Sequence, residues 1–263
     1  MHSVPLIALL FLISCTLPSG SPSPAPALKV ALPGSLPVPH FPRPDRDYPA
    51  SRALAAQKRD ALKVAYNAGS ISLDSIGQVF TDILLKEIIP HWYGTSWAFE
   101  GHTETPGQGQ IACGYFVSTT LLHAGLNLNR YRLAQQSPAD EARMLSLGDT
   151  VRVTRHDDAA KALAVWRERL RDGLYFVGLG ANHVGYLLKQ GAGLYLIHSN
   201  YASPYEVQMQ PAEASVLIGF SAFYLADITF NRRLMAYWLN GGKMPLKNNG
   251  ILLEFAVVQR LTF

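Results

Sequence analysis

Residues 182–200 read NHVGYLLKQGAGLYLIHSN, a pattern that predicts an antiparallel β-hairpin. Two apolar runs, 183–188 and 194–198, flank a connection that contains two glycines, as is typical of hairpins. If His183 pairs directly with His198, both imidazoles lie on one face of the sheet, close enough to interact. A register shift of one residue would separate them, since it turns every side chain to the other face.

Upstream, residues 111–117 read IACGYFV and contain Cys113, which with Cys15 makes up the cysteine content. Apolar residues recur at helical spacing from Phe116 onward, so Cys113 is predicted to begin a helix that Gly125 ends. A thiol at a helix N-terminus lies near the positive end of the helix dipole and near unpaired N–H groups. These favour the thiolate and offer donors for an oxyanion. The alternative is a buried, unreactive cysteine, because free cysteine is among the most buried residues.

The composition limits the classes of protein to consider. The chain has 263 residues, 48% hydrophobic and 16% charged, which is enough to bury the core of one domain or of two small ones. Its formal net charge is +4, but the basic residues are scattered and form no Lys/Arg run, which argues against nucleic-acid binding. Two cysteines cannot provide a disulfide framework.

The N-terminus predicts export. Residues 4–13 form an apolar run of signal-peptide length, too short to cross a bilayer as a helix, so residues 1–18 are expected to be a signal peptide. Leu12-Ile13-Ser14-Cys15 resembles a bacterial lipobox, which would place lipid on Cys15 and attach the protein to a membrane. Residues 25–27, Ala-Pro-Ala, offer ordinary secretory cleavage as the alternative.

An α+β domain is expected over residues 51–263, after a tether over residues 19–50 that is rich in Pro, Ser and Ala. Residues 126–173 are interpreted as an inserted helical region with helices from Ser137 and from Asp157-Asp158 to about Leu170. The other expected helices cover 51–67, 72–88 and 232–239, and the other expected strands cover 174–180, 216–220 and 223–228, with an edge strand or loose tail at 251–258.

An aromatic loop, residues 91–110, precedes the cysteine and contains Trp92, Tyr93, Trp97 and Phe99. Such a cluster is consistent either with core packing or with the wall of a substrate cleft.

Three motifs together resemble the NlpC-type cell-wall peptidases, papain-like cysteine enzymes of bacterial envelopes. They are residues 112–117 (ACGYFV), 183–187 (HVGYL) and 197–199 (IHS), and the resemblance covers about residues 91–200. It implies a papain-like fold in which N-terminal helices and the nucleophile helix pack on an antiparallel sheet. It also implies the roles of three residues, with Cys113 as the nucleophile, His183 as the base and His198 as the residue that orients it.

The chain departs from that family around the cysteine, where the usual pattern is Asp-Cys-Ser-Gly-Phe and this chain has Ala112 and Gly114-Tyr115. Trp97 stands where the family keeps a tyrosine that helps to bind the oxyanion. Tyr93 and Gln108 are the alternatives for that role. The expected oxyanion and substrate cleft comprises Tyr93, Trp97, Gln108, Gly114 and Asn200.

The expected function is hydrolysis of an amide bond in peptidoglycan stem peptides, with no metal or other cofactor. The Cys113 thiolate attacks the carbonyl, His183 protonates the leaving amine, and water hydrolyses the thioester. The alternatives are another cysteine acyl-transfer enzyme, such as a transglutaminase, acyltransferase or lipid amidase, and a non-catalytic wall-binding protein on the same fold. A zinc site of Cys113, His183, His198 and His102 has no supporting His-x-x-x-His or Cys-x-x-Cys spacing.

Overall fold

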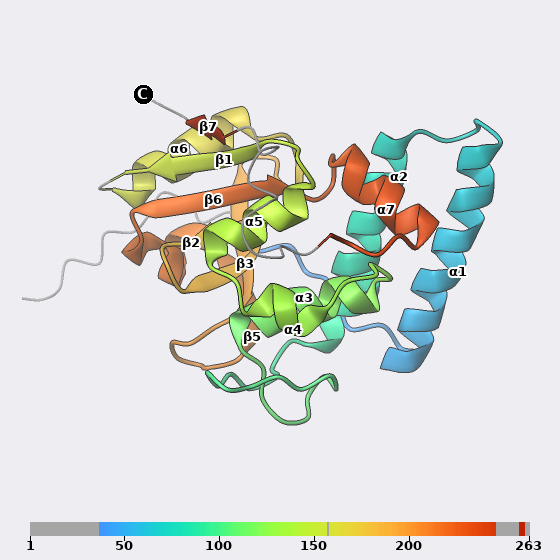
Figure 1. Ribbon diagram of the computed structural model, residues 1–263. Coiled ribbons are helices and arrows are strands. Elements are labelled where there is room, and N and C mark those ends of the chain that lie inside the picture. Colours follow the sequence, from blue (N-terminus) through green and yellow to red (C-terminus); the bar gives the residue numbers. More distant parts are fainter. Residues whose placement is uncertain (1–36, 157, 246–257, 261–263) are drawn as a thin grey trace, which may run out of the picture. The chain divides into compact units, whose positions relative to one another are not determined.

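The computed structural model describes residues 37–156, 158–245 and 258–260 and has an α+β architecture (Figure 1). The predicted signal peptide, Cys15 with its predicted lipid, and residues 19–36 of the predicted tether lie outside the described residues. Within them, no helix combines the length and apolar character that crossing a membrane requires.

The sheet has seven strands in the order β5-β4-β3-β2-β6-β1-β7. Neighbouring strands from β5 to β1 are antiparallel, and β7 runs parallel to β1. The strands are β1 (Val151–Arg155), β2 (Gly173–Leu179), β3 (His183–Gln190), β4 (Gly193–Ser199), β5 (Val207–Pro211), β6 (Ala222–Asp227) and β7 (Val258–Arg260).

The predicted hairpin is confirmed as β3 and β4, but with a different register. Tyr186 pairs with Ile197 and Gln190 pairs with Gly193, so the strands continue to a two-residue turn. Gly191 takes φ 55° in this turn, a conformation that favours glycine. Direct pairing of His183 with His198 is therefore wrong by two residues. Because side chains alternate along a strand, a shift of two still leaves both imidazoles on one face.

Two N-terminal helices form near the expected ranges 51–67 and 72–88, the first of them starting three residues early. Helix α1 (Tyr48–Asn67) has Asp47 as its N-cap, and α2 (Leu73–Asp82) has Ser72. The chain continues from α2 as a π-helical segment, η1 (Ile83–Ile88), and a 3₁₀ turn, η2 (Ile89–His91).

The domain begins before the predicted boundary at Ser51. The hydroxyl of Tyr195 on β4 donates a hydrogen bond to the carbonyl of Pro37 at 3.1 Å. Phe41 packs against the main core, and α1 starts at Tyr48. Residues 37–50, which the composition assigned to the tether, are therefore part of the folded domain. Proline blocks regular structure in such a segment, but it does not prevent an extended chain from packing on a core.

The region 126–173 is not purely helical, so the interpretation as a helical insert is wrong in one respect. It contains α4 (Arg130–Ala134), α5 (Pro138–Ser146) and α6 (Ala159–Arg169). Between α5 and α6 lies β1, which pairs with β6 along its whole length and belongs to the main sheet. The region therefore cannot be removed without removing a strand.

Beyond residue 215, the described part of the chain follows the prediction with one exception. The strand expected at 223–228 is β6, and the helix expected at 232–239 is α7 (Arg232–Asn240). The strand predicted at 216–220 is wrong, because Val216–Gly219 forms a 3₁₀ turn, η4. The hydroxyl of Ser215 accepts a hydrogen bond from the Leu217 N–H and so favours this turn over a strand. Residues 251–257 of the predicted tail lie outside the described residues.

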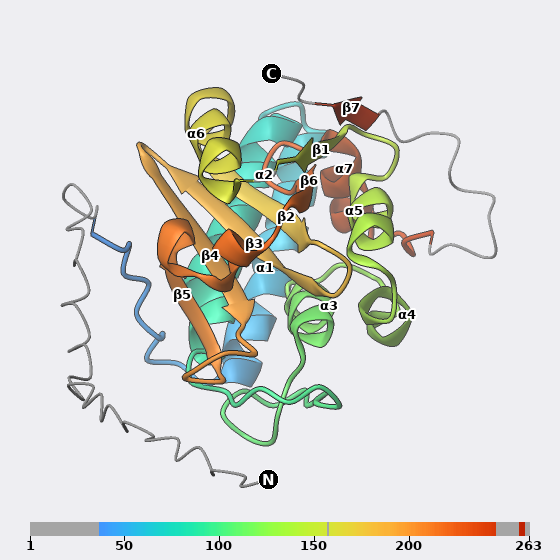
Figure 2. The same cartoon turned by 90° about the vertical axis from the view of Figure 1, so that its left-hand side faces the viewer.

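Two hydrophobic clusters pack on the sheet. The larger contains Trp92, Phe116 and Tyr186 and joins the sheet to α1, α2, α5, α7 and the helix α3 (Cys113–His123). The smaller contains Trp166 and Phe223 and lies beneath α6. Figure 2 shows α6 and the group of α1, α2 and α3 on different sides of the strands. The start of β3 thereby lies close to the start of α3, where Cys113 is found.

Candidate active site

Cys113 is the first residue of α3, as predicted, and the residue is half-buried. The N-cap residue is Ala112, which has no side-chain acceptor for the N–H groups of the first turn. These N–H groups are therefore available to a ligand, which is the arrangement an oxyanion site needs. Gly114 allows α3 and α4 to approach, because a Cβ at this position would lie 2.7 Å from the carbonyl oxygen of Ala134.

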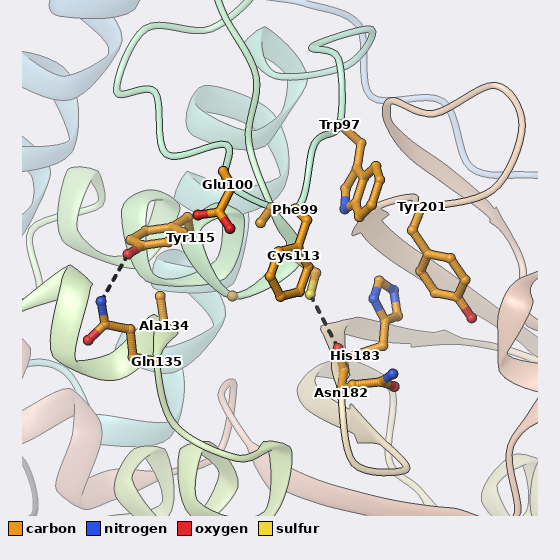
Figure 3. Close-up of a pocket in the computed structure, with 12 residues that line it drawn as sticks. Trp97, Phe99, Glu100, Cys113, Tyr115, Ala134, Gln135, Asn182, His183 and Tyr201 are labelled. Atoms are coloured by element: carbon orange, nitrogen blue, oxygen red, sulfur yellow. Dashed lines mark hydrogen bonds between the residues drawn. The ribbon is translucent and has the colours of Figure 1, made fainter.

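The two predicted histidines are in direct contact. His183 is the first residue of β3, and its Nε2 lies 2.8 Å from Nδ1 of His198 on β4. Both side chains are buried. The nitrogen of His183 left for the thiol is Nδ1. Figure 3 shows its ring between the sulfur of Cys113 and the ring of Tyr201.

Cys113 and His183 open into one cavity of about 530 Å³. Its walls are mainly aromatic or small apolar side chains, and Glu100 is its only carboxylate (Figure 3). The lining residues are Trp97, Phe99, Glu100, Ala112, Cys113, Gly114, Tyr115, Ala134, Gln135, Asn182, His183 and Tyr201. Of the residues expected in the cleft, Trp97 and Gly114 are therefore present.

The other three expected cleft residues do not line this cavity. Tyr93 packs against the main core, and its hydroxyl has no hydrogen-bond partner among the described residues. Gln108 is exposed in the loop before the cysteine. Asn200 is buried and shapes the loop after β4, because its Oδ1 accepts a hydrogen bond from the N–H of Ala202 at 3.0 Å. Spacing in the sequence did not reveal these placements, because loop geometry decides them.

Three residues absent from the prediction contribute to the site. Tyr201 packs edge-on against His183, with ring centroids 4.9 Å apart. The backbone carbonyl of Asn182 accepts a weak contact from the Cys113 thiol at 3.9 Å. The side-chain amide of Gln210 on β5 lies 3.1 Å from Nε2 of His198. Tyr201 and Asn182 are each adjacent in sequence to a predicted residue, whereas Gln210 lies on β5, a strand that the sequence pattern does not predict.

Burial dominates the electrostatics of the site. It raises the pKa of the Cys113 thiol to about 11, and the N–H groups of Val184 and Gly114 oppose this only in part. Burial also lowers the pKa of His183 to about 3, and burial together with His183 lowers the pKa of His198 well below its usual range. The resting site at neutral pH therefore holds a thiol and two neutral imidazoles. This differs from the thiolate that the helix position alone favours.

The described residues contain no group of three His, Cys, Asp or Glu side chains that could hold a metal ion. His102, the fourth member of the zinc alternative, does not line the cavity. Its Nδ1 contacts the carbonyl of Glu100 at 2.8 Å, and its ring packs on Tyr115. The histidine is thus held by neighbours in its own loop and on α3.

Comparisons with protein-family models, with curated proteins and with solved structures found no match for this chain. A functional assignment therefore rests on the chemistry of its own residues.

Proposed function

We propose that this protein is a cysteine-dependent hydrolase of amide bonds, built on a papain-like arrangement of the NlpC type. One observation carries the proposal. Cys113, at an uncapped helix start, shares a cavity with His183, and His183 is in turn held by His198. A nucleophile, a base and a residue that orients the base are the components that such a reaction requires.

The resting protonation states are compatible with general-base catalysis. A neutral His183 that carries its own proton on Nε2 can accept the thiol proton through Nδ1 while the sulfur attacks the amide carbonyl. The resulting imidazolium then donates that proton to the leaving amine. The N–H groups at the start of α3 stabilise the oxyanion. Water then attacks the thioester, His183 again accepts a proton, and the thiol is regenerated when the acid product leaves.

Peptidoglycan stem peptides are the proposed substrate, and the bacterial cell envelope is the proposed location. Support comes from the signal-peptide-like residues 1–18, the lipobox-like segment ending at Cys15, and the family resemblance around Cys113. In this proposal a lipid on Cys15 attaches the protein to the membrane, while the domain acts on the wall.

A second candidate is acyl transfer to or from a substrate with an apolar acyl group. The aromatic walls formed by Trp97, Phe99 and Tyr201 favour it, because such walls accommodate apolar groups better than a polar peptide. Phe99 is 78% exposed and offers apolar surface at the cavity.

The two candidates can be separated in one experiment. The full chain and its Cys113→Ala variant are incubated with purified peptidoglycan and, in parallel, with p-nitrophenyl esters of increasing acyl length. Mass spectrometry then identifies released fragments and any acyl group on Cys113. New amines from peptidoglycan with the unmodified chain alone support the first candidate. Acylation that increases with chain length, without fragment release, supports the second candidate. If neither fragment release nor acylation is observed, catalysis is contradicted.

The Cys15→Ala variant provides the matched control. It leaves Cys113 as the only cysteine, so acylation detected in this variant must be at Cys113.

A further inference from the structure

The hydrogen-bonded row that starts at His183 crosses three neighbouring strands. His183 on β3 contacts His198 on β4 at 2.8 Å, and His198 contacts Gln210 on β5 at 3.1 Å. Gln210 pairs with Leu196, two residues from His198, so its side chain is on the same face as the histidine. The catalytic base is therefore connected to an amide at the edge of the described sheet.

The group at the end of this row determines the direction in which the hydrogen bonds along it are donated. A neutral imidazole carries one N–H, so a histidine that donates from one nitrogen must accept at the other. His198 is engaged at both nitrogens, and His183 is engaged at Nε2. Whether Gln210 donates to His198 or accepts from it therefore determines, through His198, which nitrogen of His183 carries the proton.

In the arrangement observed, the amide nitrogen of Gln210 faces Nε2 of His198 and donates to it. His198 then donates from Nδ1 to Nε2 of His183, and His183 carries its own proton on Nδ1. In that state Nδ1 cannot accept a proton from the thiol. The thiol hydrogen is directed instead to the carbonyl of Asn182, which agrees with the 3.9 Å contact.

Rotation of the Gln210 amide by 180° about its terminal bond reverses the direction of donation in each hydrogen bond of the row. The Gln210 oxygen then accepts from Nε2 of His198, and Nδ1 of His198 accepts from Nε2 of His183. Nδ1 of His183 is left with a lone pair and can take the thiol proton. No heavy atom beyond the amide has to move far for this change.

We propose that Gln210 is a positioning residue that selects the tautomer of His183, and so determines whether His183 can act as the base for Cys113. The inference rests on the proposed function and adds a residue and a resting state to that site. Gln210 touches neither the thiol nor the cavity and acts only through His198.

The direct test is the side-chain ¹⁵N NMR spectrum of the histidines in the full chain at pH 8, which distinguishes Nδ1–H from Nε2–H. In the unmodified chain, His183 is expected to carry its proton on Nδ1. In Gln210→Glu the carboxylate can only accept, so both His198 and His183 are expected to carry their protons on Nε2. An unchanged His183 tautomer in Gln210→Glu would overturn the inference.

Two further variants keep the test decisive. Gln210→Met removes both donor and acceptor, so the two His183 tautomers should coexist; a single tautomer like that of the unmodified chain would contradict the proposal. Gln208→Met is the matched control. Gln208 lies on the same strand and pairs with His198 across the ladder, but the ring of His198 bonds Gln210. This variant should leave the spectrum of His183 unchanged.

Thiol reactivity provides a second readout. Gln210→Glu should increase the rate of Cys113 alkylation by iodoacetamide at pH 8 by about tenfold or more, because a base within reach of the thiol is typically worth at least that much. Gln208→Met should not change the rate. If peptidoglycan and the ester substrates remain intact while the tautomer of His183 changes in Gln210→Glu, the proposed function fails, but the role of Gln210 in selecting the tautomer stands. If a substrate is cleaved but the tautomer of His183 is unchanged in Gln210→Glu, only the proposed role of Gln210 is rejected.

Discussion

At the scale of single residues, the contact between the two histidines depends on a glycine. The observed register brings Gly185 of β3 opposite His198, and a Cβ at this position would lie 2.9 Å from the Cβ of His198 and 2.8 Å from the carbonyl oxygen of Ile197. A methyl group would therefore push β4 away from β3 at the site. We predict that Gly185→Ala destabilises the protein by about 1–3 kcal/mol, as overpacking does.

The same variant should also break the 2.8 Å contact between His183 and His198. Urea unfolding measures the loss of stability, and the ¹⁵N spectrum reports the contact. Gly219→Ala is the control, because nothing lies within 4 Å of a Cβ built there. Equal behaviour of the two variants would show that Gly185 has no special role.

The protonation state of Cys113 leads to a second prediction at this scale. Because burial raises the pKa of its thiol to about 11, the thiolate fraction should rise about tenfold per pH unit throughout the neutral range. The rate of alkylation by iodoacetamide, followed by mass spectrometry from pH 6 to pH 10, should rise without reaching a plateau. A fast, pH-independent rate from pH 5 upward would instead reveal a preformed thiolate–imidazolium pair.

At the scale of helices and strands, local signals in the sequence predicted most elements. The side chains of Ser72, Ser137 and Asp158 accept hydrogen bonds from the first turns of α2, α5 and α6, so these helix starts could be recognised from residue type. The hairpin of β3 and β4 was also recognisable. Its register was not, because a glycine-rich connection allows turns of several lengths.

Long-range pairing explains what the sequence did not reveal. Val151–Arg155 is short, and its identity as a strand depends on pairing with β6, about 70 residues further along the chain. The same holds for β5, and therefore for Gln210. For the candidate site, the motifs predicted Cys113, His183 and His198, and the structure places His183 in contact with His198 and in one cavity with Cys113. The residues held by loops, such as Tyr201, depend on how those loops fold over the end of the sheet.

Helix α6 provides a test of whether the two sides of the sheet are independent. Trp166 is fully buried, packs edge-on against Phe223 at 5.2 Å, and donates a hydrogen bond to Thr154 on β1 at 3.3 Å. We predict that Trp166→Ala lowers the free energy of unfolding by about 3–5 kcal/mol. Because Trp166 belongs to the smaller cluster, whereas α3 packs in the larger one, the alkylation rate of Cys113 in the folded variant should stay the same. A changed rate would show that the clusters are coupled.

At the scale of the whole molecule, Glu141 makes stability depend on pH. Its side chain is 1% exposed, its Oε2 has no hydrogen-bond partner among the described residues, and burial raises its pKa well above the usual 4.5. The folded protein therefore keeps a proton that the unfolded chain releases above pH 4.5, so this carboxyl group destabilises the fold increasingly as pH rises.

Glu141→Gln should remove that dependence. Relative to the unmodified chain, its free energy of unfolding should increase by up to about 1.4 kcal/mol per pH unit above pH 4.5. Urea unfolding at pH 5, 6 and 7 measures this difference, and Glu168→Gln is the control because its carboxylate is exposed. A difference that does not vary with pH would mean that Glu141 is ionised in the folded state.

The N-terminal boundary of the domain also acts on the whole molecule, through Tyr48. Its hydroxyl accepts a hydrogen bond from the indole N–H of Trp92 at 2.8 Å and contacts Nδ1 of His123 at 2.9 Å. Trp92 packs in turn against Phe116 of α3, with ring centroids 6.4 Å apart. A fragment of residues 51–263 lacks Tyr48 and leaves two buried polar groups without this partner.

We predict that the fragment 51–263 is less stable than the fragment 37–263 by at least about 3 kcal/mol, the usual cost of deleting a buried aromatic side chain. Thermal and urea unfolding of the two fragments measure the difference. Tyr48→Phe within 37–263 separates its causes, because it keeps the ring and removes only the hydroxyl, at a cost of about 1–3 kcal/mol. Equal stability of the two fragments would place the boundary at Ser51 after all. A lower stability accompanied by faster alkylation of Cys113 would show that residues 37–50 also hold α3 in place.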